Sequence, residues 1–498
     1  MKPINNTVLK YQNILLIRAG NSHRKKIKHP VHYAPCLPLK YAQKILQDQG
    51  QYNITLLDYW VDPPTFDGLM DQIQQQAIDL IVVSIGSPSS EAAIELCRKI
   101  KKKKALPIVA VGSDVSEKHR FYLSLPELFD VIIRGEFEIE LNALINRLNS
   151  PEDFESVKAY YNQIKSNELI QLDDIDELPV LDWSKDELTK YPYIYPMRVS
   201  QKMVSGYIST SRGCPHACTF CSPTVRKSYG RKLRTRSPEK VVEEIERLTR
   251  IGVNVVSFED DDFVLNKDHV TKICEEIVRR NLKIKWACHA RVDEVPPELL
   301  TVMKNAGCEL LLFGIESGSQ KIVNVLHKAS FQAGWRQKVK EAFDNVRRAG
   351  IASCAMFIVG SPTESEHDIQ QSIDLCQEIQ PNLVKVHFFT LYPGSVDYKR
   401  YSDKSSELQS PHHYLKPIVN LSQIDLSALK KIQRVFYKKI LFRPSFVFSH
   451  LYNYLPYYLS NSPGSLKLVK DGIMFLIHGE NEKMENSVGV VSPMPVRS

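Results

Sequence analysis

The residues STSRGCPHACTFCSP, from Ser209 to Pro223, place Cys214, Cys218 and Cys221 in one short loop between a glycine and a proline. The chain has ten cysteines, and the other seven are scattered, most of them inside apolar runs where a thiol serves as a small hydrophobe. That distribution predicts a reduced compartment and no disulfide framework. The three clustered thiols therefore predict a metal or iron–sulfur site.

Two kinds of site could use this spacing. A structural zinc site takes four ligands, usually as two separated Cys-x-x-Cys pairs, and no second pair exists here. His216 lies too close in sequence to complete a tetrahedron comfortably. An iron–sulfur cube takes one thiolate per iron, so three cysteines leave one iron open for a non-protein ligand. A chance cluster of exposed thiols would be an oxidation liability, which argues against coincidence.

Downstream of the cysteines, short apolar runs alternate with amphipathic stretches over residues 201–395. The expected strands are SGYIST, NVVSFED, KIKWACHA, ELLLFGIES, ASCAMFIVG and LVKVHFFTLYP. Six strand–helix units predict an open, partial barrel whose working face lies at the carboxyl ends of its strands. The cysteine loop directly follows the first of these strands.

Upstream, residues 1–149 predict a second α/β unit, a doubly wound parallel sheet of the Rossmann-like kind. Its expected strands, read as buried on both faces, are NILLIRA, ITLLDYW, LIVVSIG, PIVAVGS and DVIIRG. Ligands of such sheets bind at the carboxyl ends of the strands. The loops there contain small residues that let a bulky ligand approach the backbone. None is a Gly-x-Gly-x-x-Gly phosphate cradle, so a dinucleotide is disfavoured.

The rest of the 498-residue chain predicts a linker at 150–200, a helical C-terminal region at 396–479 and a disordered tail at 480–498. The net charge of +8 could suggest a nucleic-acid surface. Lys101–Lys104 are better explained as a solvated helix end, so no nucleic-acid partner is expected. The aromatic and basic C-terminal region fits a membrane-surface helix or, more commonly, a helix covering the barrel mouth. No apolar run is long enough to span a membrane and no start resembles a signal peptide, so a cytoplasmic protein is expected.

The cysteine motif, with Phe220 before its last cysteine, resembles the signature of radical S-adenosylmethionine (SAM) enzymes. Four further stretches resemble that family's strand-end elements: FEDDDF (258–263), FGIESGS (313–319), FIVGSPTES (357–365) and TLYPGS (390–395). The resemblance implies a [4Fe–4S] cluster on the three cysteines, with S-adenosylmethionine chelating the fourth iron. Reductive cleavage of that molecule would give a 5′-deoxyadenosyl radical that abstracts hydrogen from an unreactive C–H bond.

The same resemblance implies roles for single residues. The backbone around Phe220 would meet the adenine, and Tyr392 would line its pocket or simply pack. Glu316 would lie near the ribose or the methionine. Arg291 would pair with the methionine carboxylate, or form a rim salt bridge with a neighbouring carboxylate. For Glu259–Asp262 a substrate-side or structural role is preferred to a metal site.

The first unit resembles the cobalamin-binding domain that precedes the radical domain in one subclass. HYAPCLPLKYAQKILQDQG (32–50) resembles its first loop and helix, and DVIIRGEFEIELNAL (130–144) its last strand and turn. The residues implied in cofactor binding are Ser84, Gly86, Gly112, Gly135 and Glu136. No Asp-x-His-x-x-Gly motif is present, so cobalamin would bind base-off without a histidine ligand. The alternative is a sheet that only scaffolds the barrel.

These resemblances imply a cobalamin-dependent radical enzyme, foremost a methyltransferase acting on an unactivated carbon. The alternative is an oxidoreductase or cyclase with the same cofactors. An RNA-modifying methylthiotransferase is disfavoured, because residues 1–149 hold only Cys36 and Cys97 where that family carries another cluster on three cysteines, and its small β-barrel RNA-binding tail is absent. The intact triad and barrel motifs argue against a non-catalytic binding protein. The expected partners are a small-molecule substrate and a one-electron reductant such as flavodoxin or ferredoxin.

Overall fold

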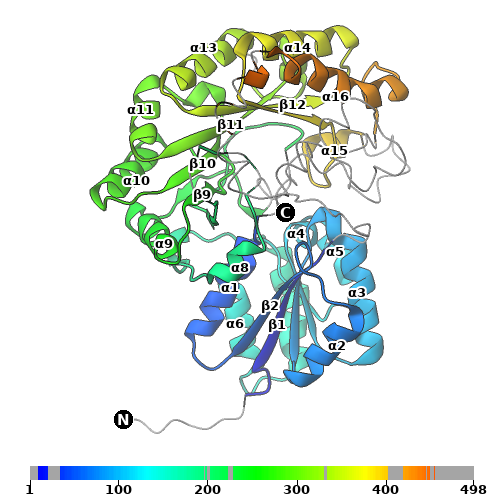
Figure 1. Ribbon diagram of the computed structural model, residues 1–498. Helices are drawn as coiled ribbons and strands as arrows, with labels where there is room; N and C mark the ends of the chain where they lie inside the picture. Colours follow the sequence, from blue (N-terminus) through cyan, green and yellow to red (C-terminus); the bar gives the residue numbers. More distant parts are fainter. Residues whose placement is uncertain are drawn as a thin grey trace.

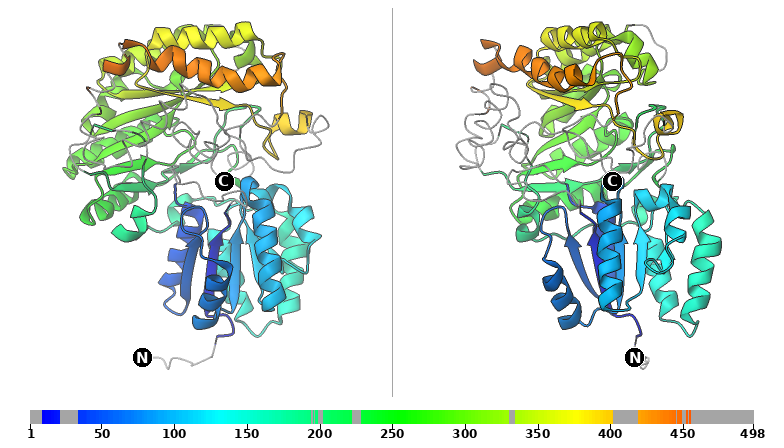
Figure 2. Two further views of the ribbon diagram at one scale, coloured as in Figure 1. Left: turned by 45° about the vertical axis from the view of Figure 1, so that its right-hand side comes forward. Right: turned by 90° about the vertical axis from the view of Figure 1, so that its right-hand side faces the viewer.

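The computed structural model describes residues 9–20, 34–193, 195, 197–198, 202–221, 228–329, 334–401, 419–444, 446–448, 452 and 454. Two parallel sheets lie end to end in the molecule, with helices packed on each (Figures 1 and 2). The predicted disordered tail at 480–498 and most of the predicted helical region at 396–479 fall outside the described residues. The architecture confirms the α/β fold class.

The first sheet has five parallel strands in the order β2-β1-β3-β4-β5. The strands are β1 (Asn13–Arg18), β2 (Asn53–Asp58), β3 (Leu80–Ser84), β4 (Ile108–Val111) and β5 (Val131–Ile132). Ile14 and Leu16 face helices α1 (Leu37–Asp48) and α6 (Glu138–Leu148), whereas Leu15 and Ile17 face α2 (Phe66–Gln75) and α3 (Ser90–Lys103). This alternation buries both faces of β1 and makes the sheet doubly wound. Short helices α4 (Ser113–Glu117), α5 (His119–Leu123) and α7 (Phe154–Ala159) complete this part.

Strand β2 corrects one expectation. It was predicted to be buried on both faces, but only Asp58 of its six residues is buried, and Asn53 is exposed. The strand forms the edge of the sheet, with β1 as its only neighbour. An apolar run identifies a strand but does not say whether the strand is central or at the edge.

The second sheet has six parallel strands in the order β13-β12-β11-β10-β9-β6. They are β6 (Ser205–Ile208), β9 (Val255–Phe258), β10 (Lys285–Ala290), β11 (Cys308–Glu316), β12 (Ala352–Val359) and β13 (Leu383–Phe388). Strands β6 and β13 do not pair with each other, so the sheet is an open barrel. Its outer face is covered by α9 (Pro238–Arg250), α10 (Lys267–Arg279), α11 (Pro297–Asn305), α12 (Gln320–Val325), α13 (Trp335–Arg348) and α14 (Glu366–Ile379) (Figure 1).

Helix α16 (Leu426–Leu441) closes the open edge at β13, after the short helix α15 (Val396–Tyr401). The backbone N–H of Val386 donates to the hydroxyl of Tyr437 at 2.8 Å, and the side-chain amide of Gln433 donates to the Val386 carbonyl at 2.7 Å. These side chains satisfy backbone groups that an edge strand would otherwise expose. Within the described part of the chain, no helix combines the length and apolar character needed to cross a bilayer.

The segment between the sheets binds both of them. Ile175, Leu178 and Leu181 are buried in the core of the second sheet, next to the short helix α8 (Lys185–Thr189). The Tyr191 hydroxyl donates to Asp58 at the end of β2, and its carbonyl accepts from the Tyr207 hydroxyl on β6 at 2.6 Å. The segment therefore fixes one sheet against the other.

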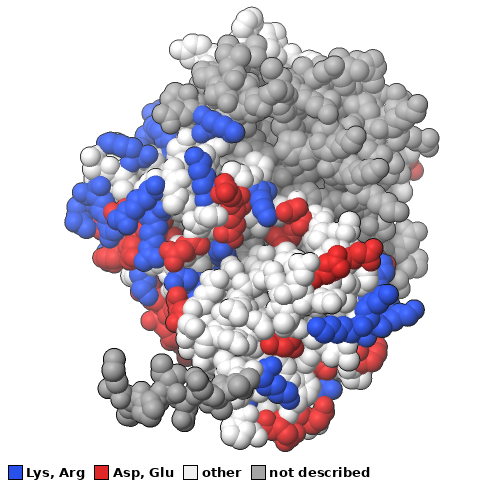
Figure 3. Space-filling model, turned by 60° about the horizontal axis from the view of Figure 1, so that its bottom comes forward, with Lys and Arg blue, Asp and Glu red and all other residues white. Residues whose placement is uncertain are grey.

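The exposed charges of the molecule are mixed in sign. Lys, Arg, Asp and Glu intermingle on the face drawn in Figure 3. Lys101 pairs with Asp130 at 2.6 Å, and Arg250 pairs with Glu246 at 2.6 Å. The basic runs of the sequence are thus partly neutralised by local partners.

Candidate functional site

The cysteine loop starts at a glycine that no other residue could replace. Gly213 has φ +95°, and a Cβ there would lie 2.2 Å from the Lys232 carbonyl oxygen. The strands on either side, β7 (Ser211–Arg212) and β8 (Arg234–Thr235), form a short antiparallel hairpin. The Cys214 N–H donates to the Gly230 carbonyl at 3.2 Å. The close backbone approach holds the first cysteine at the carboxyl end of β6.

The far end of the loop is held by two backbone hydrogen bonds. The N–H of Thr219 donates to the Leu326 carbonyl at 3.0 Å, and its carbonyl accepts from the N–H of Asp397 at 3.1 Å. Leu326 follows α12, which comes after β11, and Asp397 lies in α15, which comes after β13. The loop is therefore bonded to segments that follow two later strands of the sheet. Cys218 and Cys221 are thereby brought to the same barrel mouth as Cys214.

The three thiols suit a polynuclear centre better than a single ion. None of them forms a disulfide bond, Cys218 is buried, and Cys214 and Cys221 are partly buried. The three sulfurs do not all lie within 4.8 Å of one another, as donors to one ion would. A cube accepts a thiolate at each of three separate irons, which spreads the sulfurs. Burial, aided by the charges of Asp261 and Asp262, raises the pKa of the Cys214 thiol to about 12, so iron binding releases a proton there.

The acidic stretch after β9 supports the loop. One oxygen of Asp260 accepts hydrogen bonds from the Thr210 N–H and hydroxyl, both at 3.0 Å, and from the Ser211 hydroxyl at 2.6 Å. The Ser211 N–H donates to the same oxygen. Asp260 is buried, and these donors satisfy the hydrogen-bonding capacity of that oxygen. Its place in the structure is that of a support for the strand that enters the loop.

A partly buried His–Asp–Glu cluster connects the loop to its surroundings through His216. His216 Nε2 is 2.9 Å from Glu294 Oε1 and 3.7 Å from Asp262 Oδ2. Their ligand atoms converge closely enough to hold a cation. Burial, and then the charge of Glu294, raises the pKa of Asp262, whereas hydrogen bonds with His216 and Asp262 lower the pKa of Glu294. From the sequence, His216 was considered only as a zinc ligand, and no sequence pattern pairs it with Glu294.

Two cations lie near Cys218. Arg291 donates two hydrogen bonds to the Asp293 carboxylate, at 3.1 and 3.0 Å, and a third to the Lys328 carbonyl at 2.9 Å. Lys328 Nζ lies 3.0 Å from Glu316 Oε1. A thiolate at Cys218 would raise the pKa of both cations, so both favour the charged cluster ligand. The carboxylate partner that the sequence allowed for Arg291 is present.

Glu316 stands in a left-handed conformation, with φ +66°, at a bulge where β11 shifts register against β12. The bulge turns the buried side chain toward Lys328. A non-glycine residue with positive φ is uncommon and is concentrated at functional sites. Phe220 packs against an apolar cluster that includes Leu326 and Leu391. Tyr392, which directly follows Leu391, is also buried. These residues form an apolar border of the barrel mouth.

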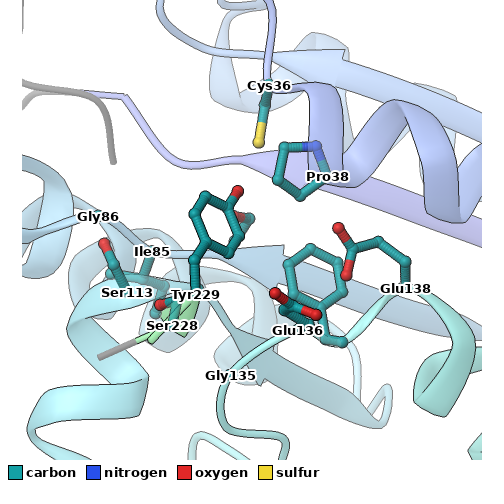
Figure 4. A pocket seen from close by; sticks show the side chains of 13 residues that line it. Cys36, Pro38, Ile85, Gly86, Ser113, Gly135, Glu136, Glu138, Ser228 and Tyr229 are labelled. Carbon is teal, nitrogen blue, oxygen red and sulfur yellow. The ribbon is translucent and has the colours of Figure 1, made fainter. Parts of the chain in front are cut away.

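A second pocket opens at the carboxyl ends of the first sheet (Figure 4). Its empty space is about 380 Å³, open solvent included. The predicted residues Ser84, Gly86, Gly112, Gly135 and Glu136 all line it. The described lining is completed by Cys36, Pro38, Ile85, Ser113, Phe137, Glu138, Ser228 and Tyr229. No histidine occurs in this described lining.

Two of the lining glycines are required by their surroundings. Gly135 has φ +84°, and a Cβ there would lie 2.1 Å from the Ile170 carbonyl oxygen. Gly112 has φ +107°, with the Ile85 carbonyl oxygen 2.7 Å from the Cβ position. The backbone can follow these paths only without a side chain, which leaves the pocket floor open to a bulky ligand.

The carboxylates at the pocket edge are already bound. Glu136 accepts from Arg234 at 2.6 and 2.9 Å and from the Leu172 N–H at 2.6 Å. Glu138 accepts from Arg212 at 2.5 Å. All four charged side chains are at most 7 % exposed. Glu136 was expected to contact a cofactor, and in the structure its carboxylate binds the hairpin that leads into the cysteine loop.

Comparison with known proteins agrees with this geometry. Residues 208–376, which run from β6 into α14 and include the cysteine loop, match the model of the radical SAM superfamily. The chain therefore contains a radical SAM domain. Such a domain implies a [4Fe–4S] cluster and S-adenosylmethionine, and the three cysteine thiols at the barrel mouth fit the cluster.

Several relatives of this chain span both sheets. An uncharacterized methyltransferase of Pyrococcus horikoshii is 22 % identical over 433 residues, which is 84 % of this chain and 90 % of the relative. The anaerobic magnesium-protoporphyrin IX monomethyl ester cyclase of Cereibacter sphaeroides is 26 % identical over 425 residues, 81 % of this chain and 67 % of the relative.

The fold of this chain is also similar to a solved structure. The cobalamin-dependent S-adenosylmethionine radical enzyme OxsB aligns with a TM-score of 0.65 and 16 % identity, over 96 % of this chain and 78 % of that chain. At this identity the likeness establishes the shared fold.

Proposed function

We propose that this radical SAM enzyme binds cobalamin in the pocket at the first sheet and methylates an unactivated carbon of a small molecule. The observation that carries the proposal is the junction of two sites in one chain. The pocket edge and the cysteine loop share the β7–β8 hairpin, through Arg212 and Arg234. A ligand in the pocket would therefore lie at the approach to the barrel mouth, where the radical forms.

The pocket has features that suit a large, uncharged ring system. Its floor is glycine and serine, and its edge carboxylates are neutralised by arginines. The lining offers no histidine among its described residues, which supports base-off binding without a histidine ligand. When bound, methylcobalamin would supply a methyl group that the radical chemistry could deliver to the substrate.

The residues of the chain would divide the work as follows. Cys214, Cys218 and Cys221 would hold the cluster, and Phe220, Arg291, Glu316 and Tyr392 would border the S-adenosylmethionine site. Ser84, Gly86, Gly112 and Gly135 would shape the cofactor pocket, with Glu136 holding its edge. A one-electron reductant of the flavodoxin or ferredoxin class would supply electrons. We place the protein in the cytoplasm, in keeping with its reduced cysteines.

The likeness to a cobalamin-dependent radical enzyme over nearly the whole chain and the methyltransferase relative support this proposal. The cyclase relative supports a second candidate, a cobalamin-dependent reaction that oxidises or closes a ring without methyl transfer. The two candidates share every residue above and differ in the fate of the substrate radical.

The proposal is tested in two stages. The first stage is the cobalamin content of protein reconstituted anaerobically with iron, sulfide and hydroxocobalamin, then passed through gel filtration. Close to one cobalamin per chain supports it; an iron-loaded protein without cobalamin overturns it. The second stage uses S-adenosylmethionine with a deuterated methyl group and candidate substrates. A product carrying the label identifies a methyltransferase, whereas a product that has only lost hydrogens identifies the second candidate.

A further inference from the structure

The pocket at the first sheet is closed by a residue of the second. Of the described residues that line it, only Ser228 and Tyr229 come from the chain beyond the first sheet and its helices. The Tyr229 ring stands in the middle of the pocket, with its hydroxyl on the side of Cys36 and Pro38 (Figure 4). Tyr229 lies eight positions after Cys221, in the segment that returns from the cysteine loop to β8.

Two arginines hold this tyrosine. The Arg234 guanidinium donates to the Tyr229 carbonyl at 2.6 Å, and the Arg212 guanidinium carbon lies 4.8 Å from the centre of the Tyr229 ring. The first contact fixes the backbone and the second is a cation–π contact to the ring. Both arginines are in turn bound by Glu136 and Glu138 on the opposite wall of the pocket.

These ion pairs are expensive to bury for stability alone. Desolvation of two buried charges often cancels their attraction, and apolar residues of similar size would stabilise a fold as well. What such pairs do supply is a defined geometry, since each charge has a single low-energy position. Here the ion pairs fix the position of Tyr229, an aromatic side chain between the cofactor pocket and the cysteine loop.

The size of the pocket requires its ligand to meet that wall. The empty space of the pocket is about 380 Å³ even with open solvent included, and a corrin with its side chains is larger. The floor is rigid backbone with close glycine contacts, so a bound macrocycle must extend toward the barrel side. Tyr229 is the large side chain on that side.

We propose that Tyr229 is a positioning residue of the cofactor pocket, the aromatic wall against which the bound macrocycle packs, held in place by Arg212 and Arg234. This inference rests on the proposed function, in which the macrocycle is the corrin of cobalamin. Because Arg212 directly precedes Gly213 and Cys214, the wall and the cluster loop share one support. The distance between the two cofactor sites is then set by the β7–β8 hairpin.

The first test is an absorption titration of the full, cluster-loaded protein with hydroxocobalamin. Tyr229→Ala removes the ring, and we expect cobalamin to bind at least about tenfold more weakly, because the contact area of an aromatic ring is lost. Tyr229→Phe keeps the ring and rescues binding to within roughly threefold of wild type, since ring area carries most of the contact. The spectrum of the bound cobalamin should also differ in Tyr229→Ala, a change that a purely structural role would not produce.

The outcomes separate this inference from the proposed function. Wild type that binds no cobalamin overturns both. Wild type and Tyr229→Ala that bind cobalamin equally, with the same spectrum, overturn the inference alone. Iron content and thermal unfolding of each variant report whether the fold is intact.

A second measurement needs no destabilising variant. Fluorotyrosine placed at position 229 of the otherwise unchanged chain gives a fluorine resonance whose shift reports contact with the macrocycle. We expect this resonance to move when hydroxocobalamin binds. Fluorotyrosine at position 41 is the matched control, because Tyr41 lies 5.8 Å from the same Arg212 guanidinium but does not line the pocket. A resonance at 229 that stays unchanged in the cobalamin-bound protein overturns the inference.

Discussion

Arg212 and Glu138 face each other at 2.5 Å across the junction of the two sheets, and both side chains are almost completely buried. Arg212 belongs to the strand that enters the cysteine loop, and Glu138 begins helix α6 of the first sheet. Together with the neighbouring Arg234–Glu136 pair, this ion pair joins the candidate radical site to the candidate cofactor pocket.

Removing one partner of this pair should lower the free energy of unfolding far more than removing both. Arg212→Met leaves Glu138 buried without its cation, and we expect a loss of about 3–5 kcal/mol in the free energy of unfolding. The double variant with Glu138→Met should recover most of that loss. Urea unfolding of the two single variants and the double variant gives the coupling energy. Additive effects of the two substitutions would contradict the assignment.

Gly135 should tolerate no side chain, although a similar glycine elsewhere should. Gly135→Ala places a Cβ 2.1 Å from a carbonyl oxygen, so the backbone must shift and the pocket floor with it. Gly50 also has positive φ, +70°, but nothing lies within 4 Å of its Cβ position. Gly50→Ala should cost only the left-handed strain, about 1–2 kcal/mol. Unfolding free energies of the two variants make the comparison, and equal losses would show that the close contact at Gly135 is unimportant.

Lys385 should make the protein more stable as the pH rises from about 7. Burial lowers the pKa of this lysine from 10.5 to about 7 in the folded state. No carboxylate of the described residues pairs with it, and its ammonium group contacts the Tyr195 hydroxyl. Between pH 7 and 10.5 the unfolded chain holds a proton that the folded protein has released, so stability increases with pH across that window.

The check is the urea midpoint of wild type and Lys385→Met between pH 7 and 10.5. The variant should show a smaller increase with pH. The neighbouring His387, whose pKa burial and Lys385 lower to about 3, acts in the separate window between pH 3 and 6.5. Parallel curves for the two proteins above pH 7 would rule out the lysine as the source.

The cysteine triad should be separable from the other cysteines by metal content. Each of Cys214→Ala, Cys218→Ala and Cys221→Ala should lose most iron and sulfide after anaerobic reconstitution and should cleave no S-adenosylmethionine, because each thiolate holds a different iron. Cys274→Ala is the control, since that thiol is buried in helix α10. Iron analysis and the amount of 5′-deoxyadenosine measure the outcome. A triad variant that retains both would refute the cluster assignment.

Much of the architecture follows from the sequence. Alternating apolar runs predicted the five strands of the first sheet and the six of the second, because a buried parallel strand must be apolar whatever its neighbours are. The loop with Cys214, Cys218 and Cys221 and the glycines at the strand ends were also visible, since metal ligation and positive φ each require specific residue types. The edge position of β2 was not visible, because it depends on strand order.

Pairing of distant side chains was decided only by the tertiary structure. Glu136 was expected at the cofactor, but docking of the two sheets brings it to Arg234, 98 positions away. Tyr229 carries no signal in the sequence, since it lies in a loop without periodicity, and its position in the pocket depends on two arginines held from the other sheet. Local chemistry therefore determined the strands and the cluster ligands of this protein. The position of the pocket wall was decided by the tertiary structure. Of the many charge pairs that the sequence allows, only the few that the packed sheets bring into contact can form in the buried junction.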